Sequence, residues 1–499
     1  MKIQKLRFEY FIYIFFALFY LWLASKIPYT HDDWDWGLDI GMQQWLTASV
    51  NSRYVGNFFE IIMTRSGLLK TIIMGGSFFV LPYLLSHIPS KTHDSNRVLL
   101  FLAANFLLLT MSRLVWSETY GWVAGFANFV LSSIFTLLCL TQWLPLCDSQ
   151  YQPVKHTFIG NAMWCSIAFL GQLFIENLSI VMVAASIAVC IVSYIRSKKI
   201  PTHYTLMAIG TLLGLCVMFS SSVYDNLFGA GEAVDGYRQL IVSADSTIAT
   251  KVFNVFVQAA RLATRAGEAN FVLCLSVLVV LTCKIAINKN KKLIHNIFIG
   301  INLLFGLYFT INFILQTDYT PDRVLLSAFA AMMNALYFIV VAAEAFILYR
   351  GIPVLQWKLL STWVFGIALL APLLVTSEAG YRLIFSLNIM VILFVLLILQ
   401  DILPSVAANK LLPCAFLCAV VIPVVICVIA YSAIGQCTQQ RLTLIEITSF
   451  YNGSEITLPA YPYANYLHAP DPVDAPHLKH FKEFYGIGEH VNLVFEGIE

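Results

Sequence analysis

Long apolar stretches separated by short polar segments run through most of the chain. A helix needs about 20 predominantly apolar residues to cross the hydrocarbon of a bilayer. By that criterion the pattern predicts thirteen membrane-spanning helices, at residues 9–27, 68–88, 97–114, 122–143, 158–175, 178–195, 203–221, 268–287, 293–315, 324–348, 358–376, 383–400 and 411–434. We therefore expect an all-α polytopic membrane protein.

Composition agrees with a membrane protein and excludes one class of partner. Of the 499 residues, 59% are hydrophobic and 12% are charged, whereas a soluble domain carries about 25% charged residues. The net charge is only +2, and lysine and arginine form no dense cluster. Because nucleic-acid binding needs a basic patch, we expect no nucleic-acid partner.

Charge asymmetry between the loops predicts the orientation. Thirteen spans put the two chain ends on opposite sides of the membrane, and lysine concentrates in cytoplasmic loops. If the N-terminus is cytoplasmic, 12 of the 17 lysines face inward and 23 of the 28 carboxylates face outward. We therefore expect a transmembrane domain at residues 1–434 and an extracytoplasmic C-terminal module at residues 435–499.

The longer outer segments have recognisable local patterns. In the loop 28–67 we expect amphipathic helices on the membrane surface around residues 45–46 and 58–63, and in the loop 222–267 a helical stretch over residues 252–263. In the C-terminal module, alternating apolar residues predict a strand over residues 441–447 and another over 456–459. The module is therefore expected to be small and to have mixed secondary structure.

A cluster of charged and aromatic side chains directly follows the first span. Its ionisable members are His31, Asp32, Asp33 and Asp35. Charged groups near hydrocarbon are costly and mark functional sites. Asp32 or Asp33 is a candidate catalytic base, which His31 and Asp35 could assist in substrate binding, and Asp33 could hold a divalent cation, Mg²⁺ or Mn²⁺, against a phosphate. The alternative is an acidic surface loop anchored by Trp34 and Trp36.

Two further outer turns carry candidate substrate-binding residues. Glu118, Tyr120 and Trp122 lie between the third and fourth spans, where a carboxylate and aromatic faces suit sugar binding. Glu176 and Asn177 lie in a nearly loopless turn after the fifth span, where a carboxylate points into a shared polar cavity. The alternatives are a helix hairpin with interfacial aromatics and a solvated turn.

Arginine is distributed differently from lysine, because nine of the 13 arginines fall on the outer side. The planar guanidinium group suits bidentate binding of phosphate. Arg323 and Arg382, each in a short outer turn that opens a helix, are the candidate ligands of the donor phosphate, and Arg53 and Arg113 are further candidate substrate-binding residues. The alternative is that they pair with the excess of outer carboxylates.

The position of Asp32 and Asp33 after the first span resembles the GT-C superfamily of integral membrane glycosyltransferases. Residues 122–128, 171–177 and 372–382 also look like those of a large bacterial group of such proteins. The resemblance implies a GT-C fold, a polyprenyl-phosphate-linked sugar donor and inverting hexosyl transfer at the outer face of the bacterial cytoplasmic (inner) membrane. O-antigen glucosyltransferases share this general plan. The tail lacks the WWDYG-like motif of oligosaccharyltransferases, which favours a surface polysaccharide or lipid-linked glycan as acceptor.

Two other functions remain open. An O-antigen or capsule polymerase would also be polytopic with outer arginines, although those usually concentrate in two large loops. A transporter or lipid flippase would need polar residues within several spans. Asn334 and Glu344 could mark such a path, but Glu344 is expected to reach water near the inner end of its span.

Overall fold

The computed structural model describes residues 2–89, 96–224, 240–241, 246–288, 293–315, 324–377, 380–406, 412–450, 454–472 and 474–496. Helices dominate these residues. They are α1 (Lys2–Lys26), α2 (Asp33–Gly37), α3 (Asp39–Thr47), α4 (Tyr54–Arg65), α5 (Gly67–His87), α6 (Arg97–Leu109), α7 (Arg113–Ser117), α8 (Val123–Gly125), α9 (Leu131–Trp143), α10 (Phe158–Leu170), α11 (Glu176–Ser197), α12 (Thr202–Met218), α13 (Ile248–Glu268), α14 (Phe271–Ile287), α15 (Leu293–Leu315), α16 (Val324–Leu348), α17 (Pro353–Ala368), α18 (Phe385–Val406), α19 (Leu412–Phe450) and α20 (Ala475–Phe484). The expected all-α polytopic architecture is confirmed.

Among the described residues, nine helices are long and apolar enough to cross a membrane. The count is ten if α13 and α14, which meet at a 77° bend, form one span. Three shorter apolar helices, α6, α10 and α12, have 10–17 residues. These helices lie where the thirteen expected segments lie, so the apolar pattern located the helices correctly.

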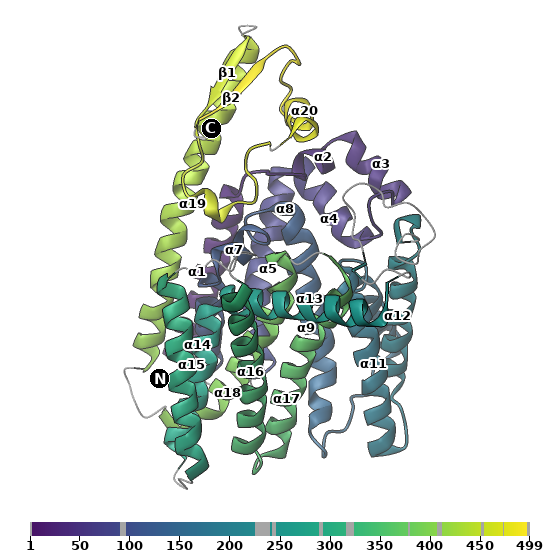
Figure 1. Cartoon of the computed structure of the whole chain (residues 1–499), viewed down its shortest axis with the longest axis vertical. Coiled ribbons are helices and arrows are strands. Elements are labelled where there is room, and N and C mark those ends of the chain that lie inside the picture. Colours follow the sequence, from purple (N-terminus) through teal and green to yellow (C-terminus); the bar gives the residue numbers. More distant parts are fainter. Residues whose placement is uncertain are drawn as a thin grey trace.

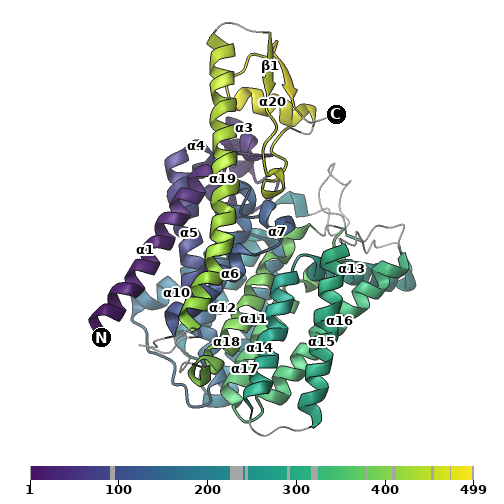
Figure 2. The same ribbon diagram turned by 90° about the vertical axis from the view of Figure 1, so that its left-hand side faces the viewer.

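The long helices run roughly side by side, and smaller elements gather at one end of the bundle (Figure 1). That end holds α2, α3, α4 and the C-terminal elements, and α13 lies across the bundle. The N-terminus of α1 lies toward the opposite end (Figures 1 and 2). We call the end that holds α2 the α2 end.

Several helices break where the sequence predicts continuous spans. The segment expected at 97–114 ends as α6 at Leu109, and Ser112 then caps the separate helix α7 by accepting from the N–H of Leu114. The segment expected from residue 122 begins as α8 and passes through a π-helical turn, Phe126–Val130, into α9. Such π turns are frequent at functional sites.

The C-terminal module begins inside a helix, which corrects the expected strand at 441–447. Helix α19 continues through those residues to Phe450, and Arg441 secures it by donating to the carbonyl of Pro459 and to Asp471. Strand β1 (Glu455–Leu458), expected from the sequence, pairs in parallel with β2 (Asn492–Phe495). Helix α20 lies between them in the chain.

The module packs directly on the segment that follows α1. Trp34 is completely buried and meets the ring of Phe481 edge to face, with ring centroids 5.0 Å apart. Ile445, Ile456, Leu458, Ile487 and Val491 belong to the same apolar cluster. Because burial of a large aromatic side chain contributes a few kcal/mol, Trp34 is a main anchor of the module.

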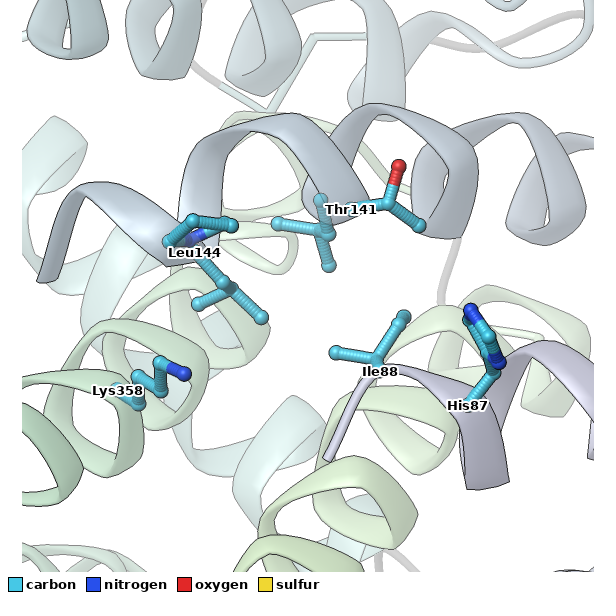
Figure 3. A pocket seen from close by; sticks show the side chains of 7 residues that line it. His87, Ile88, Thr141, Leu144 and Lys358 are labelled. Carbon is cyan, nitrogen blue, oxygen red and sulfur yellow. The ribbon is translucent and has the colours of Figure 1, made fainter. Parts of the chain in front are cut away.

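A small cavity of about 190 Å³ lies far from the α2 end. Figure 3 shows His87 at the end of α5, Thr141 on α9 and Lys358 on α17 around it. Helix α5 has 21 residues, so its two ends lie about 30 Å apart. A Cβ atom added at Gly67, the first residue of α5, would lie 4.0 Å from the hydroxyl of Tyr29, which precedes α2. The cavity at the other end of α5 is therefore separate from the acidic cluster.

Glu344 differs from its expected environment. It was expected to reach water, but it is completely buried, and Oε2 accepts a hydrogen bond of 3.2 Å from Asn302. The same amide of Asn302 lies 3.2 Å from the hydroxyl of Thr282. The prediction was wrong because packing between α14, α15 and α16, which the sequence pattern does not reveal, encloses the carboxyl group.

Candidate functional site

Asp33 is buried and caps a helix that lies elsewhere in the chain. One carboxylate oxygen accepts from the N–H of Ala124 at 2.9 Å, and the other from the N–H groups of Thr30 and Val123 at 2.9 and 3.4 Å. The first N–H groups of a helix have no partner within it, so Asp33 satisfies α8 from outside. Burial and the charge of Asp32 raise the pKa of Asp33 to about 8, although the hydrogen bonds from the three N–H donors act to lower it.

Asp32 is the more accessible carboxylate of the pair. Its side chain is 31% exposed, and Oδ1 accepts a 2.9 Å hydrogen bond from the indole N–H of Trp122. The ring Nδ1 of His31 lies 3.5 Å from the same oxygen. Burial would raise the pKa of Asp32, but His31 and the Trp122 N–H outweigh it and lower that pKa. Asp32 is thus oriented and favoured in its ionised form.

Glu60, on α4, brings a third carboxylate to this point. One oxygen from each of Asp32, Asp33 and Glu60 lies within 4.8 Å of the others, a spacing that could hold a metal ion. Glu60 is 1% exposed, and neither of its carboxylate oxygens has a hydrogen-bond partner. Burial and then the charges of Asp32 and Asp33 raise the pKa of Glu60 well above its ordinary value.

The C-terminal module contributes histidines beside Asp32. His31 adopts a left-handed backbone conformation, with φ 53°, and donates its N–H to the carbonyl of Ala469. Its ring lies 5.0 Å from that of His468 and 4.7 Å from that of His477, centroid to centroid. His477 in turn pairs with Asp474 at 2.7 Å. The loop after α1 and the module therefore form one wall of the site together.

Arg382 and Trp122 lie on the neighbouring side. The guanidinium carbon of Arg382 is 5.6 Å from the ring centroid of Trp122, and Glu118 accepts from the backbone N–H of Arg382 at 2.9 Å. Burial and the charges of His31 and Arg382 lower the pKa of His468 to about 4. The expected ligands Glu118, Trp122 and Arg382 are thus brought together, whereas Arg323 lies outside the described residues.

Other expected binding residues have partners within the protein. Arg53 binds Glu176 through two guanidinium nitrogens, the shorter contact being 2.9 Å, and the hydroxyl of Tyr224 donates to the same carboxylate at 2.8 Å. Arg53 thus follows the alternative expected for the outer arginines, in which they pair with outer carboxylates. The buried amide of Asn177 donates to the carbonyl of Leu369 at 3.0 Å. These contacts join the loop after α1 to α11 and α11 to the end of α17.

Three further expected residues have contacts of their own within the protein. Tyr120 is buried, and its ring packs on neighbouring aromatic side chains. The guanidinium group of Arg113 lies over the ring of Tyr466, 3.6 Å from its centroid. Asp35 pairs with Nδ1 of His480 at 2.7 Å. Arg113 and Asp35 thus fasten the C-terminal module to the bundle.

Sequence reasoning missed Glu60, His468 and His477. Glu60 is the only charged residue in the apolar stretch 58–63, and a lone carboxylate in such a stretch is a signal that could have singled it out. The two histidines lie more than 430 residues after Asp32 in the chain. Only the docking of the module on α2 reveals them.

Comparisons with known proteins give no match. No family model matches the sequence, and no curated protein and no solved structure is detectably similar to it.

Proposed function

We propose that this protein is a GT-C-type glycosyltransferase. It would move a sugar from a polyprenyl-phosphate donor to a surface polysaccharide or lipid-linked glycan. The observation that carries the proposal is the arrangement of Asp32, a partly exposed carboxylate held by the Trp122 N–H, beside Arg382, whose guanidinium group lies over the same indole. A base at the edge of one aromatic ring and a cation for phosphate over the same ring suit sugar transfer from phosphate.

The proposed chemistry uses Asp32 as general base. Its carboxylate takes the proton of an acceptor hydroxyl while that oxygen attacks the anomeric carbon of the donor sugar with inversion. The bond between the anomeric carbon and the phosphate oxygen breaks, and its electron pair leaves with the polyprenyl phosphate. Arg382 binds this leaving phosphate, and Trp122, which is 7% exposed, orients the Asp32 carboxylate through its indole N–H.

The donor tail requires an apolar path to the site. A cavity of about 710 Å³ lies between α6, α14, α18 and α19, and its lining is almost entirely apolar. Helix α18 begins three residues after Arg382, and α6 leads through α7 to Glu118. The cavity is lined by α18 from Val395 onward, about 15 Å along the helix from its start. In this proposal the isoprenoid chain lies in the cavity, and its phosphate end extends along α18 to Arg382.

The membrane arrangement is part of the proposal. All thirteen apolar segments, including α6, α10 and α12, would cross the membrane, with a cytoplasmic N-terminus and an extracytoplasmic module. The separation of the N-terminus from the C-terminal elements in Figure 1 supports an odd number of crossings. The α2 end would then face outward from the bacterial cytoplasmic membrane, where lipid-linked sugars and surface glycans meet.

Purified protein in proteoliposomes tests this function. We expect release of undecaprenyl phosphate from one member of a panel of undecaprenyl-phosphate hexoses, dependent on an added lipid-linked glycan. Turnover of an undecaprenyl-diphosphate oligosaccharide alone, with chain extension, would instead identify a polymerase. No turnover of any monosaccharide donor would overturn the proposal.

One observation favours transport as a second candidate function. The buried carboxyl group of Glu344 contacts Asn302, which lies beside Thr282, so a polar group stands within the bundle. Intramembrane carboxyl groups commonly mark ion or proton paths. Translocation of a fluorescent lipid-linked sugar in proteoliposomes, lost in Glu344→Gln and unchanged in Asp32→Asn, would support transport over transfer.

A further inference from the structure

We propose that Asp32, Asp33 and Glu60 bind one hard divalent cation, with Glu60 as the ligand that the sequence alone does not reveal. Three carboxylate oxygens, one from each residue, lie within 4.8 Å of one another. Metal–oxygen distances of about 2.0–2.6 Å place opposite ligands of one ion about 4–5 Å apart and adjacent ligands closer. The spacing therefore fits a single shared ion.

The state of Glu60 is the independent observation that points to a ligand. Its side chain is 1% exposed, and both oxygens lack a hydrogen-bond partner. An ionised carboxylate buried without a partner costs several kcal/mol, and a protonated one would need an acceptor for its O–H. Two more carboxylates, Asp32 and Asp33, lie within 4.8 Å, so a bound cation resolves the orphaned oxygens and the repulsion among the three groups together.

The protein's own cations near the cluster have other partners. The ammonium group of Lys70 donates to the carbonyl of Ile27 and lies over the ring of Tyr29, 4.6 Å from its centroid. The guanidinium group of Arg53 binds Glu176. Neither cation donates a hydrogen bond to Glu60, so both of its carboxylate oxygens remain available as ligands.

The rigidity of the three ligands supports a preformed site. Asp33 is fixed by three backbone N–H groups and Asp32 by the Trp122 N–H. Glu60 belongs to α4, which packs on α2, α5 and α8. Three protein oxygens leave several coordination positions for water or for an oxygen of a phosphate ligand. A role of the ion in sugar transfer rests on the proposed function, whereas the binding itself does not.

Binding of Mn²⁺ to the purified full-length protein in detergent tests the inference. We expect about one Mn²⁺ per chain, counted by the electron paramagnetic resonance signal of free Mn²⁺ after treatment with chelator and retitration, and competition by Mg²⁺ or Ca²⁺. Glu60→Gln and Asp32→Asn should each weaken binding at least about tenfold, since each removes one charged ligand. Asp39→Asn is the matched control, because Asp39 is exposed on the neighbouring helix α3.

The outcomes separate the two proposals. Absence of saturable Mn²⁺ binding in the wild-type protein, or equal affinity in Glu60→Gln, would overturn the cation site, and the wild-type and Asp32→Asn titrations decide this even if Glu60→Gln fails to fold. The titration contains no sugar donor, so its failure leaves the transferase proposal standing. Saturable binding without transfer from any donor would leave the cation site and remove the transferase.

Discussion

The indole N–H of Trp122 donates to Oδ1 of Asp32 over 2.9 Å, across 90 residues of sequence. This bond joins the turn before α8 to the segment after α1, and it aims the carboxylate that we assign as the base. Asp33 makes a second connection between the same two segments through the N–H groups of α8. Two adjacent carboxylates therefore have different roles: Asp33 holds the backbone, and Asp32 faces the site.

Trp122→Phe tests the orienting role of this bond. The substitution keeps an aromatic ring and removes the N–H donor. A hydrogen bond to a charged group contributes about 1.5–3 kcal/mol, so we expect transfer to fall about tenfold to a hundredfold. The thermal unfolding midpoint should also fall, because Trp122 is buried and its bond joins two segments, so the rate is measured on the folded protein. An unchanged rate constant in proteoliposomes would show that the bond does not position the base.

Arg382→Gln tests the phosphate ligand. We expect a higher KM for the polyprenyl-phosphate donor, by about tenfold or more, because a charge-assisted contact to phosphate is lost. Arg350→Gln is a matched control, since Arg350 is an exposed arginine of the same chain between α16 and α17. Equal KM values in the two variants would remove Arg382 from the donor site.

Glu176→Gln tests a structural ion pair. Glu176 and Arg53 side chains are 8% and 12% exposed, and removal of one partner from a buried pair costs about 3–5 kcal/mol because the other charge is left uncompensated. We expect a clear loss of thermal stability in detergent. The double variant Arg53→Met with Glu176→Leu should recover part of it. A midpoint equal to that of the wild type would instead assign these residues to ligand binding.

Gly121→Ala tests the docking of the C-terminal module. A Cβ atom at position 121 would lie 1.8 Å from the backbone carbonyl oxygen of Tyr466, so the module must move away. We expect faster amide hydrogen exchange in residues 454–472 and weaker transfer, because His468 leaves the site. Gly76→Ala is the control, since nothing lies within 4 Å of its added Cβ. Identical exchange in both variants would contradict the docking described above.

The helices could be predicted from the sequence because lipid-facing and core positions are both apolar, which gives long uninterrupted stretches. The positions where the helices break could not be predicted. Leu109, where α6 ends, is followed by residues 110–112 that are ordinary in either a helix or a turn, and tertiary packing decides between them. Residues 441–447 alternate like a strand, but the continuation of α19 and the contacts of Arg441 hold them in a helix.

The site could be predicted only in part. Asp32 and Asp33 stand out because three carboxylates follow the first span directly, and the structure brings Trp122 and Arg382 to them. Glu176 and Asn177 place a carboxylate and an amide in an outer turn, as a binding site would. In the structure, however, Glu176 binds Arg53 and Asn177 binds a backbone carbonyl. Charge and turn position alone do not separate a binding residue from an internal ion pair, because both need a polar group beside an apolar bundle.

The most direct measurement for the central claim is the transfer rate of Asp32→Asn in proteoliposomes with an undecaprenyl-phosphate hexose. Asparagine keeps the shape of the side chain and an acceptor for the Trp122 N–H, but it cannot take a proton. A general base contributes about a hundredfold to ten-thousandfold to a rate, so we predict a loss of that size, with Asp39→Asn as active as the wild type. Full activity of Asp32→Asn would contradict the account.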